Sequence, residues 1–183
     1  GSGGGFRSFA PQVETLASRG FRAVAWNMPG YGLSVPVEPY NLKGLAESAA
    51  ALIDGLTAEG GAPVALVGQG MGGMVAQELV LRRPELVRQL VLVATAAAVL
   101  PADGYAEHIA QGERWLAEGQ EMAQIAETLT PRLVGSGALP EGVALATFCQ
   151  RQVPAATWRH ALQAMSGFDR RAALAHIHVP TLL

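Results

Sequence analysis

Apolar positions in the first half of the chain follow two different spacings. Residues 21–26 and 87–94 are short, near-continuous apolar runs, which are typical of parallel strands in a sheet covered on both faces. Residues 9–18 and 42–56 repeat apolar side chains every three or four positions, the spacing of a helix with one buried face. Strands and helices in alternation indicate an α/β fold.

A glycine-rich turn joins one apolar strand to the helix after it. Residues 63–67 are apolar, glycines follow at Gly68, Gly70, Gly72 and Gly73, and a helical pattern continues toward Pro84. In the G-x-S-x-G nucleophile elbow, such a turn holds a serine hydroxyl at the top of a sheet, and side chains at the flanking glycines would clash. Position 70 is glycine, so the turn has the frame of this elbow without the attacking hydroxyl.

The pattern changes after residue 98. Residues 99–157 show helical spacing and no convincing strand, and a strand pattern returns only at 178–183. We therefore expect residues 1–98 to be the N-terminal part of an α/β core, 99–157 a helical cap, and 158–183 the return to the core. A helical insertion of this kind is expected over the carboxyl edge of the sheet, where open α/β folds bind ligands.

Composition excludes several classes of protein. The 183 residues are 50% hydrophobic and 15% charged, enough apolar material for one sizeable core. A net charge of -2 provides no field that would attract nucleic acid or anionic lipid, so we expect neither as a partner. No apolar run approaches the roughly 20 residues that span a bilayer. The only cysteine, Cys149, lies in an apolar stretch, which indicates a buried residue and a reducing, cytoplasmic compartment.

Motifs in consecutive order resemble those of the α/β-hydrolase superfamily, most closely its esterase, lactonase and carbon-carbon hydrolase group. Residues 1–4 resemble the end of the His-Gly-x-Gly-Gly oxyanion loop, and 27–34 resemble the Asp-x-Pro-Gly-x-Gly-x-Ser turn. Residues 68–73 resemble the elbow, and 179–183 the Val-Pro-Thr-Leu strand before the acid loop. The resemblance implies a parallel-sheet α/β-hydrolase fold with a helical cap, represented here by its central portion and incomplete at both ends.

The chain departs from this family at positions that carry chemistry. Family members have serine where this chain has Gly70, commonly histidine at Gln69, and usually aspartate at Asn27. The resemblance places the catalytic acid and histidine after residue 183. We interpret the histidines present as surface or interface residues, Asp103 as a loop or helix-cap residue, and Asn27 as a turn former bonded to its own backbone.

The resemblance also implies an oxyanion hole made of main-chain groups. The N–H of Met71, which follows the nucleophile position, and the N–H of Ser2 in the glycine loop would donate to the substrate oxygen. Gly3 and Gln69 would adjoin the substrate. Because these donors belong to the backbone, loss of a serine side chain need not remove them, and a bound carbonyl or carboxylate at Met71 is expected.

The glycine run has a competing interpretation. Residues 68–73 also read G-x-G-x-x-G between a strand and a helix, as in dinucleotide-binding folds. The acidic residue that would bind the ribose is absent from the end of the next strand. We therefore favour the elbow and expect no cofactor and no metal.

Apolar residues of the predicted cap allow two interpretations. Trp115 and Trp158 could line a pocket for a small apolar acyl compound, or pack the cap onto the sheet, which their helical spacing favours. The family's strand order would leave residues 21–26 and 63–69 without the strand that joins them. From this we expect that the 183 residues are part of a longer chain and are not a stable monomer alone.

The sequence is compatible with three functions. The first, which we favour, is an enzyme that hydrolyses a carboxylic ester, lactone or related acyl substrate, inactive in the form with Gly70. The second is a ligand-binding protein that has lost the chemistry. The third is a serine-independent lyase or oxygenase of the same fold, which would use a histidine base.

Overall fold

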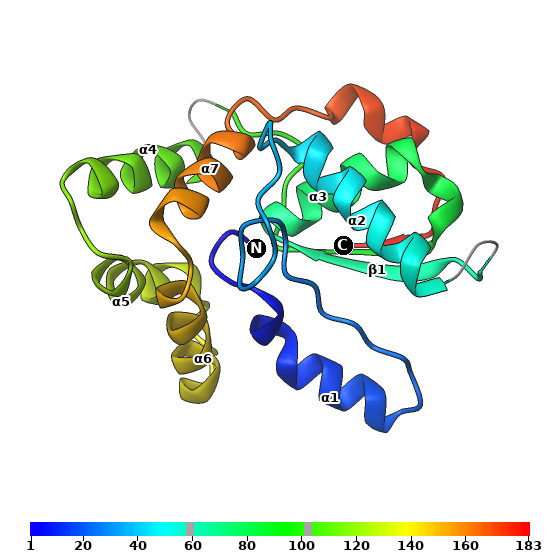
Figure 1. The fold of residues 1–183 in the computed structure, drawn as a ribbon, viewed down its shortest axis with the longest axis horizontal. Helices are drawn as coiled ribbons and strands as arrows, with labels where there is room; N and C mark the ends of the chain where they lie inside the picture. The colour runs from blue at the N-terminus through cyan, green and yellow to red at the C-terminus, as the bar shows by residue number, and fades with distance from the viewer. Residues whose placement is uncertain (58–60, 101–103) are drawn as a thin grey trace. The chain divides into compact units, whose positions relative to one another are not determined.

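The computed structural model describes residues 1–57, 61–100 and 104–183 (Figure 1). These residues form two compact units. The first comprises Gly1–Ser2, Val37–Glu113 and His160–Leu183, and the second comprises Gly3–Pro36 and Arg114–Arg159. Asp103 lies outside the described residues.

A parallel sheet with helices forms the first unit. Strands β1 (Val64–Gln69), β2 (Val87–Val93) and β3 (Thr181–Leu182) lie in the order β1-β2-β3, and each pair is parallel. Leu66 of β1 lies opposite Leu90 of β2. The predicted α/β fold with a parallel sheet is therefore confirmed.

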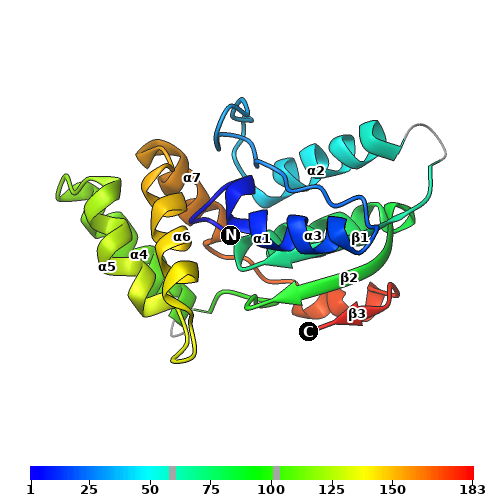
Figure 2. The ribbon, with the colours of Figure 1, turned by 90° about the horizontal axis from the view of Figure 1, so that it is seen from below.

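Two helices pack on one face of this sheet. Helix α3 (Met71–Arg82) contacts β1, and α2 (Leu42–Thr57) packs on α3, so that α3 lies between α2 and the strands in Figure 2. The apolar face of α2 predicted by its spacing is buried, with Leu45 and Ile53 among its buried residues. The core of this unit therefore lies between α3, α2 and the inner face of the sheet.

The face of the sheet that points away from α3 is more exposed than the sequence predicts. The apolar run in β2 predicts burial on both faces, but Val67 and Val93 are 47% and 45% exposed. Leu90 and Leu92, on the face toward α3, are buried. Side chains alternate between the faces of a strand, and α2 and α3 cover only one of them.

Helices and 3-10 turns complete the first unit. The 3-10 turn η2 (Pro84–Leu86) joins α3 to β2, and η3 (Arg171–His176) precedes β3. Helix α4 (Gly104–Ala117) begins in this unit, and α7 (Ala155–Met165) ends in it. Both helices fall in or beside the region predicted to be helical.

The second unit contains the glycine loop at the start of the chain and a pair of packed helices. It includes η1 (Phe6–Phe9), α1 (Ala10–Ser18), α5 (Met122–Leu133) and α6 (Pro140–Arg151). Helices α5 and α6 lie side by side. A capping box begins α5, in which Glu121 and Gln124 exchange hydrogen bonds between side chain and backbone. The described part of residues 99–157 is thus helical and contains no strand, as its spacing predicts.

The strand predicted at residues 21–26 is absent. The structure assigns no strand to this segment, and Phe21 and Val24 are 56% and 53% exposed. A strand is defined by hydrogen bonds to a neighbour, and this segment pairs with none among the described residues. Apolar spacing alone was therefore insufficient to form a strand here.

No helix in the described part of the chain combines the length and apolar character needed to cross a membrane.

A buried carboxylate fixes α3 to the segment before β3. Glu78 is 1% exposed, and its Oε2 accepts hydrogen bonds from Nε and Nη2 of Arg82 at 3.1 and 2.9 Å. Its Oε1 accepts a hydrogen bond from Nε of Arg170. Burying a carboxylate is costly unless it is paired, so both arginines are needed to keep Glu78 in the core.

We predict that Glu78→Gln lowers the free energy of unfolding by about 1–3 kcal/mol, because a charge-assisted buried contact is lost. Urea denaturation of the complete protein measures this change. Glu47→Gln is the control, because the Glu47 pair with Lys43 joins side chains that are 62% and 60% exposed and should contribute little. Equal losses of unfolding free energy for Glu78→Gln and Glu47→Gln would contradict a stabilising role for the buried Glu78 contacts.

Candidate functional site

The turn between β1 and α3 has the backbone geometry of a nucleophile elbow. Gly70 stands between the last residue of β1 and the first of α3, with φ 54° and ψ -124°. Residues with side chains rarely adopt such a positive φ, and a nucleophile elbow is known for this strain. The sequence therefore builds the strained turn with the residue that adopts it at least cost.

Hydrogen bonds hold the backbone of Gly70 on both sides. Its N–H donates to the Val93 carbonyl at 3.0 Å, which ties the turn to the end of β2. Its carbonyl accepts from the Gly73 N–H at 2.9 Å and from the Thr95 hydroxyl at 2.7 Å. The elbow is thus fixed by β2, by the first turn of α3 and by the segment after β2.

The neighbouring glycines are required to different degrees. A Cβ at Gly68 would lie 2.6 Å from the Gly72 carbonyl oxygen, and one at Gly73 would lie 2.6 Å from the Thr95 side chain. A Cβ at Gly72 would meet only the Gly1 nitrogen, at 3.8 Å. The expectation that both flanking glycines avoid a clash is therefore correct for Gly68 and wrong for Gly72. The second close approach involves Gly73 instead, because the segment after β2 crosses the helix there.

Position 70 has room for a side chain. A Cβ on Gly70 would lie 3.9 Å from the Ala94 carbonyl oxygen, 3.9 Å from the Gly1 Cα and 4.0 Å from the Tyr105 hydroxyl. These are ordinary van der Waals distances. The Tyr105 hydroxyl donates to the Ala94 carbonyl at 3.0 Å, so the surroundings of this position are polar on one side.

Tyr105 is a site residue that the sequence analysis missed. It comes from the first turn of α4, in the region that the pattern marks only as helical. Ala94, its hydrogen-bond partner, has φ 45° although it is not glycine. Backbone strain of this kind often accompanies functional sites, but no residue type at position 94 signals it in the sequence.

Met71, the predicted main-chain donor, directly follows Gly70. It is the first residue of α3 and is 1% exposed. The first N–H groups of a helix have no acceptor within the helix, and the helix dipole places partial positive charge at this end. The start of a helix is a general site for anions and polarised carbonyls, and Met71 occupies this position in α3.

The structure brings the start of the glycine loop to the elbow. A Cβ on Gly1 would lie 2.5 Å from Oε1 of Gln69, and the Gly1 Cα adjoins position 70. Ser2 follows directly and belongs to the same unit. Within the first unit, Gly70, Met71, Gln69 and the chain leading into Ser2 are therefore neighbours.

The remaining loop glycines pack against polar side chains in the second unit. In the direction of their absent Cβ atoms, Gly3 faces Oε1 of Gln150, and Gly5 faces Oδ1 of Asn27. The Phe6 N–H donates to Oδ1 of Asn27 at 2.9 Å. Asn27 was expected to bond locally as a turn former, but this bond joins the turn to a distant part of the chain.

The tryptophans predicted to adjoin the substrate lie in the second unit. Trp158 is fully buried, and Trp115 is 8% exposed with the Arg132 guanidinium 5.8 Å from its ring centroid. Cys149 is buried, as its sequence context predicts.

The three atoms nearest to a Cβ at position 70 belong to Ala94, Gly1 and Tyr105, and none of them is a histidine atom. Burial lowers the pKa of His108, which lies in α4. The His160 ring lies 5.6 Å from that of Tyr40, whose pKa burial raises to about 12. His176 ends η3. Within the described residues, no cluster of His, Cys, Asp and Glu could hold a metal ion.

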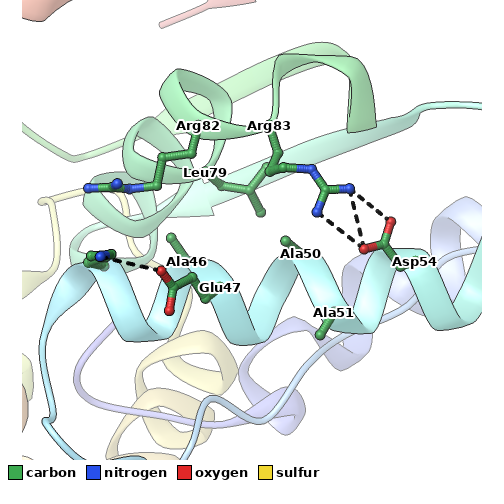
Figure 3. Close-up of a pocket in the computed structure, with 9 residues that line it drawn as sticks. Ala46, Glu47, Ala50, Ala51, Asp54, Leu79, Arg82 and Arg83 are labelled. Atoms are coloured by element: carbon green, nitrogen blue, oxygen red, sulfur yellow. Dashed lines mark hydrogen bonds and ion pairs between the residues drawn. The ribbon is translucent and has the colours of Figure 1, made fainter.

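The groove in Figure 3 lies at the other end of α3 from Met71. Its lining includes Leu79, Arg82 and Arg83 from the last turns of α3 and the residue after it. Arg83 pairs with Asp54 at 3.3 Å, and Lys43 pairs with Glu47 at 3.8 Å. Arg82 pairs with Glu78 at 2.9 Å, so each charged side chain of the groove has an oppositely charged partner and none remains to select a ligand.

We predict that Gly68→Ala lowers the free energy of unfolding by about 1–3 kcal/mol, because the new methyl group meets backbone atoms. Gly55→Ala is the matched control, since a Cβ at this helical glycine meets nothing within 4 Å and should be neutral or slightly stabilising. Thermal denaturation compares the two variants. A neutral Gly68→Ala would contradict the close approach of β1 and α3.

Known proteins resemble this chain along its whole length. The profile of the family described as serine aminopeptidase, S33, matches residues 1–183. The chain is 30% identical over 194 aligned positions to the "putative carbamate hydrolase RutD" of Azorhizobium caulinodans, covering 100% of this chain and 69% of that protein.

Solved structures share the fold. A hydrolase from Pseudomonas aeruginosa superimposes with a TM-score of 0.77 at 29% identity, over 98% of this chain and 66% of that one. A thermophilic esterase from Thermogutta terrifontis gives a TM-score of 0.81 at 23% identity, over 99% of this chain and 66% of that one. Across the relatives, the matched segment spans from 8% to 69% of the other protein's length.

The family match agrees with the interpretation of the glycine turn as a nucleophile elbow. The parallel sheet, the strained turn at Gly70 and the full-length match to the family profile lead to one assignment. The chain belongs to the serine aminopeptidase S33 family of α/β-hydrolases.

Proposed function

We propose that this α/β-hydrolase-family protein has a site for a carboxylic ester, lactone or related small apolar acyl compound, and that the form with Gly70 binds this compound without cleaving it. In this proposal the carbonyl or carboxylate oxygen accepts hydrogen bonds from the N–H groups of Met71 and Ser2. No cofactor takes part. The names of two similar proteins, a putative carbamate hydrolase and an esterase, support the acyl class of the ligand.

The observation that carries the proposal is the backbone of the elbow. Gly70 has a positive φ and donates a hydrogen bond to Val93 of β2, and α3 begins at the next residue, Met71. This geometry supports Met71 as the main-chain donor of an acyl-binding site. This donor does not depend on the side chain at position 70. Electrostatic stabilisation of an oxyanion is commonly the largest single contribution to acyl transfer, so the proposal assigns the main binding contribution to these main-chain donors.

Cleavage requires a group that Gly70 lacks. Acyl transfer through a covalent intermediate needs a nucleophile activated by a neighbouring base, and glycine has no hydroxyl, thiol or carboxylate. Loss of the serine in an enzyme of this mechanism lowers kcat by roughly 10⁶. The Gly70 form should therefore bind acyl compounds without forming an acyl-enzyme.

The surroundings of Gln69 support binding as the natural function of the Gly70 form. The Oε1 atom of Gln69 lies 2.5 Å from the point that a Cβ of Gly1 would occupy, so the Gln69 side chain adjoins the glycine loop. Gln69 also replaces the residue common in the family next to the nucleophile. A substitution made only to disable the enzyme would not include this second, well-packed change.

We predict that Gly70→Ser in the complete protein raises the rate of p-nitrophenyl butyrate hydrolysis by at least about 10³-fold, because it adds the missing nucleophile to an intact oxyanion site. Release of p-nitrophenol gives the rate. Position 70 has room for the serine side chain, and the elbow tolerates its strained φ in this family.

Gly70→Ala is the matched control for this prediction. It adds the same Cβ at the same positive φ but no hydroxyl, so it should remain as inactive as the Gly70 form. Equal rates for the serine and alanine variants would remove the hydrolytic part of the proposal. If the Gly70 protein and both variants still bound butyrate, the ligand-binding part of the proposal would be retained.

A further inference from the structure

A short segment at the end of β2 holds the backbone of Gly70 at both of its polar groups. The Val93 carbonyl accepts a hydrogen bond from the Gly70 N–H at 3.0 Å, and the Thr95 hydroxyl donates to the Gly70 carbonyl at 2.7 Å. Between these two residues lies Ala94, which has a positive φ of 45°. Three consecutive residues therefore bind the elbow through its N–H and its carbonyl.

The strained conformation of Ala94 is held by its surroundings. A residue with a side chain keeps a positive φ only where the contacts around it outweigh the strain. The Ala94 carbonyl accepts a hydrogen bond from the Tyr105 hydroxyl at 3.0 Å, and the residues on both sides of Ala94 bond to Gly70. The backbone before Thr95 is thus held in the conformation in which the Thr95 side chain reaches the elbow.

The first turn of α3 leaves space for the Thr95 side chain. A Cβ at Gly73 would lie 2.6 Å from Cβ, Cγ2 and Oγ1 of Thr95. Glycine lowers the stability of a helix relative to alanine, so glycine at position 73 is unfavourable for α3 by itself. The close approach of Thr95, which brings its hydroxyl to the Gly70 carbonyl, accounts for a glycine at this position.

The hydrogen bond from Thr95 also orients the amide group that follows Gly70. The Gly70 carbonyl and the Met71 N–H belong to one planar peptide group, and in a trans peptide the oxygen and the hydrogen point to opposite sides. A bond that fixes the carbonyl oxygen therefore fixes the direction of the Met71 N–H. This control matters most with glycine at position 70, because glycine restricts φ and ψ less than any residue with a side chain.

The other donor to this carbonyl cannot supply the same restraint. The Gly73 N–H donates to the Gly70 carbonyl at 2.9 Å, but it belongs to α3 and moves with the helix. Thr95 instead ties the peptide to the segment after β2. A hydrogen bond accepted by a peptide carbonyl also polarises the group and strengthens its N–H as a donor.

We propose that Thr95 is a positioning residue of the acyl-binding site: its hydroxyl holds the Gly70–Met71 peptide in the orientation in which the Met71 N–H donates to the carbonyl or carboxylate oxygen of the bound compound. This rests on the proposed function and adds to it a residue that acts through the peptide. Thr95, Gly70 and Met71 all belong to the first unit.

The test uses the complete Gly70 protein with Thr95→Val, which keeps the shape of the side chain and replaces the hydroxyl by a methyl group. Isothermal titration calorimetry gives the Kd for sodium butyrate, and thermal denaturation gives the Tm without ligand. Thr57→Val is the matched control, because the Thr57 hydroxyl also makes a partly buried hydrogen bond to a backbone carbonyl, that of Ile53 in α2, at 2.9 Å. Thr95→Ser is the conservative variant that retains the hydroxyl.

We expect Thr95→Val to weaken butyrate binding by about three- to tenfold, as loss of the contribution of one hydrogen bond implies. Thr57→Val should lower the Tm to a similar degree and leave the Kd unchanged. Thr95→Ser should bind butyrate as the unsubstituted protein does, even though loss of the methyl group lowers its Tm. A residue with a purely structural role would not separate binding from stability in this way.

Other outcomes overturn the inference in distinguishable ways. An unchanged Kd for Thr95→Val would overturn it and leave the proposed function in place. Equally weak binding by Thr95→Ser would overturn it as well, because the methyl group rather than the hydroxyl would then be responsible. No binding of butyrate to the unsubstituted protein would overturn the proposed binding function, and the inference with it.

A second pair of variants covers the case in which Thr95→Val does not fold. Thr95→Ser and Thr95→Ala differ only in the hydroxyl, so their comparison isolates the same hydrogen bond. We expect Thr95→Ala to bind butyrate more weakly than Thr95→Ser. Equal Kd values for these two variants would contradict the positioning role of Thr95.

Discussion

The backbone conformation of Gly70 is the constraint on which the site depends. A parallel strand must turn sharply into a helix within one residue, and the positive φ of that residue makes the turn possible. The hydrogen bond from the Gly70 N–H to Val93 fixes the turn to the neighbouring strand. As a result, α3 begins at Met71 directly after the turn, at the position to which the proposal assigns the acyl oxygen.

This arrangement separates two properties that a serine normally combines. The strained turn and the main-chain donors belong to the backbone, while the nucleophile belongs to the side chain. Glycine adopts the positive φ at position 70 at little cost and has no nucleophile, and the hydrogen bonds of the turn use only the Gly70 backbone. A member of a hydrolase family can in this way retain a binding site after it loses its chemistry, and can become more stable in doing so.

The elements that depend on residues close together in the sequence were predicted correctly. The strand, the turn and the helix around Gly70 follow from a continuous motif, and α2 and α5 follow from their apolar spacing. Residues 21–26 were wrongly predicted as a strand, because a strand depends on a partner that local spacing does not reveal. Likewise, the close contact at Gly73 depends on Thr95, which comes from another segment.

Other contacts that the sequence does not predict also depend on distant segments. Tyr105 reaches the elbow only because α4 begins beside the end of β2, and Gln150 meets Gly3 only because α6 packs on the glycine loop. Neither residue belongs to a motif, and a tyrosine or a glutamine in a helix carries no signal by itself.

The most direct test of the central claim is a crystal structure of the complete Gly70 protein with butyrate. The account predicts a carboxylate oxygen about 3 Å from the Met71 nitrogen, within hydrogen-bond distance. Butyrate bound only elsewhere, or an α3 N-terminus occupied by another part of the protein, would contradict it.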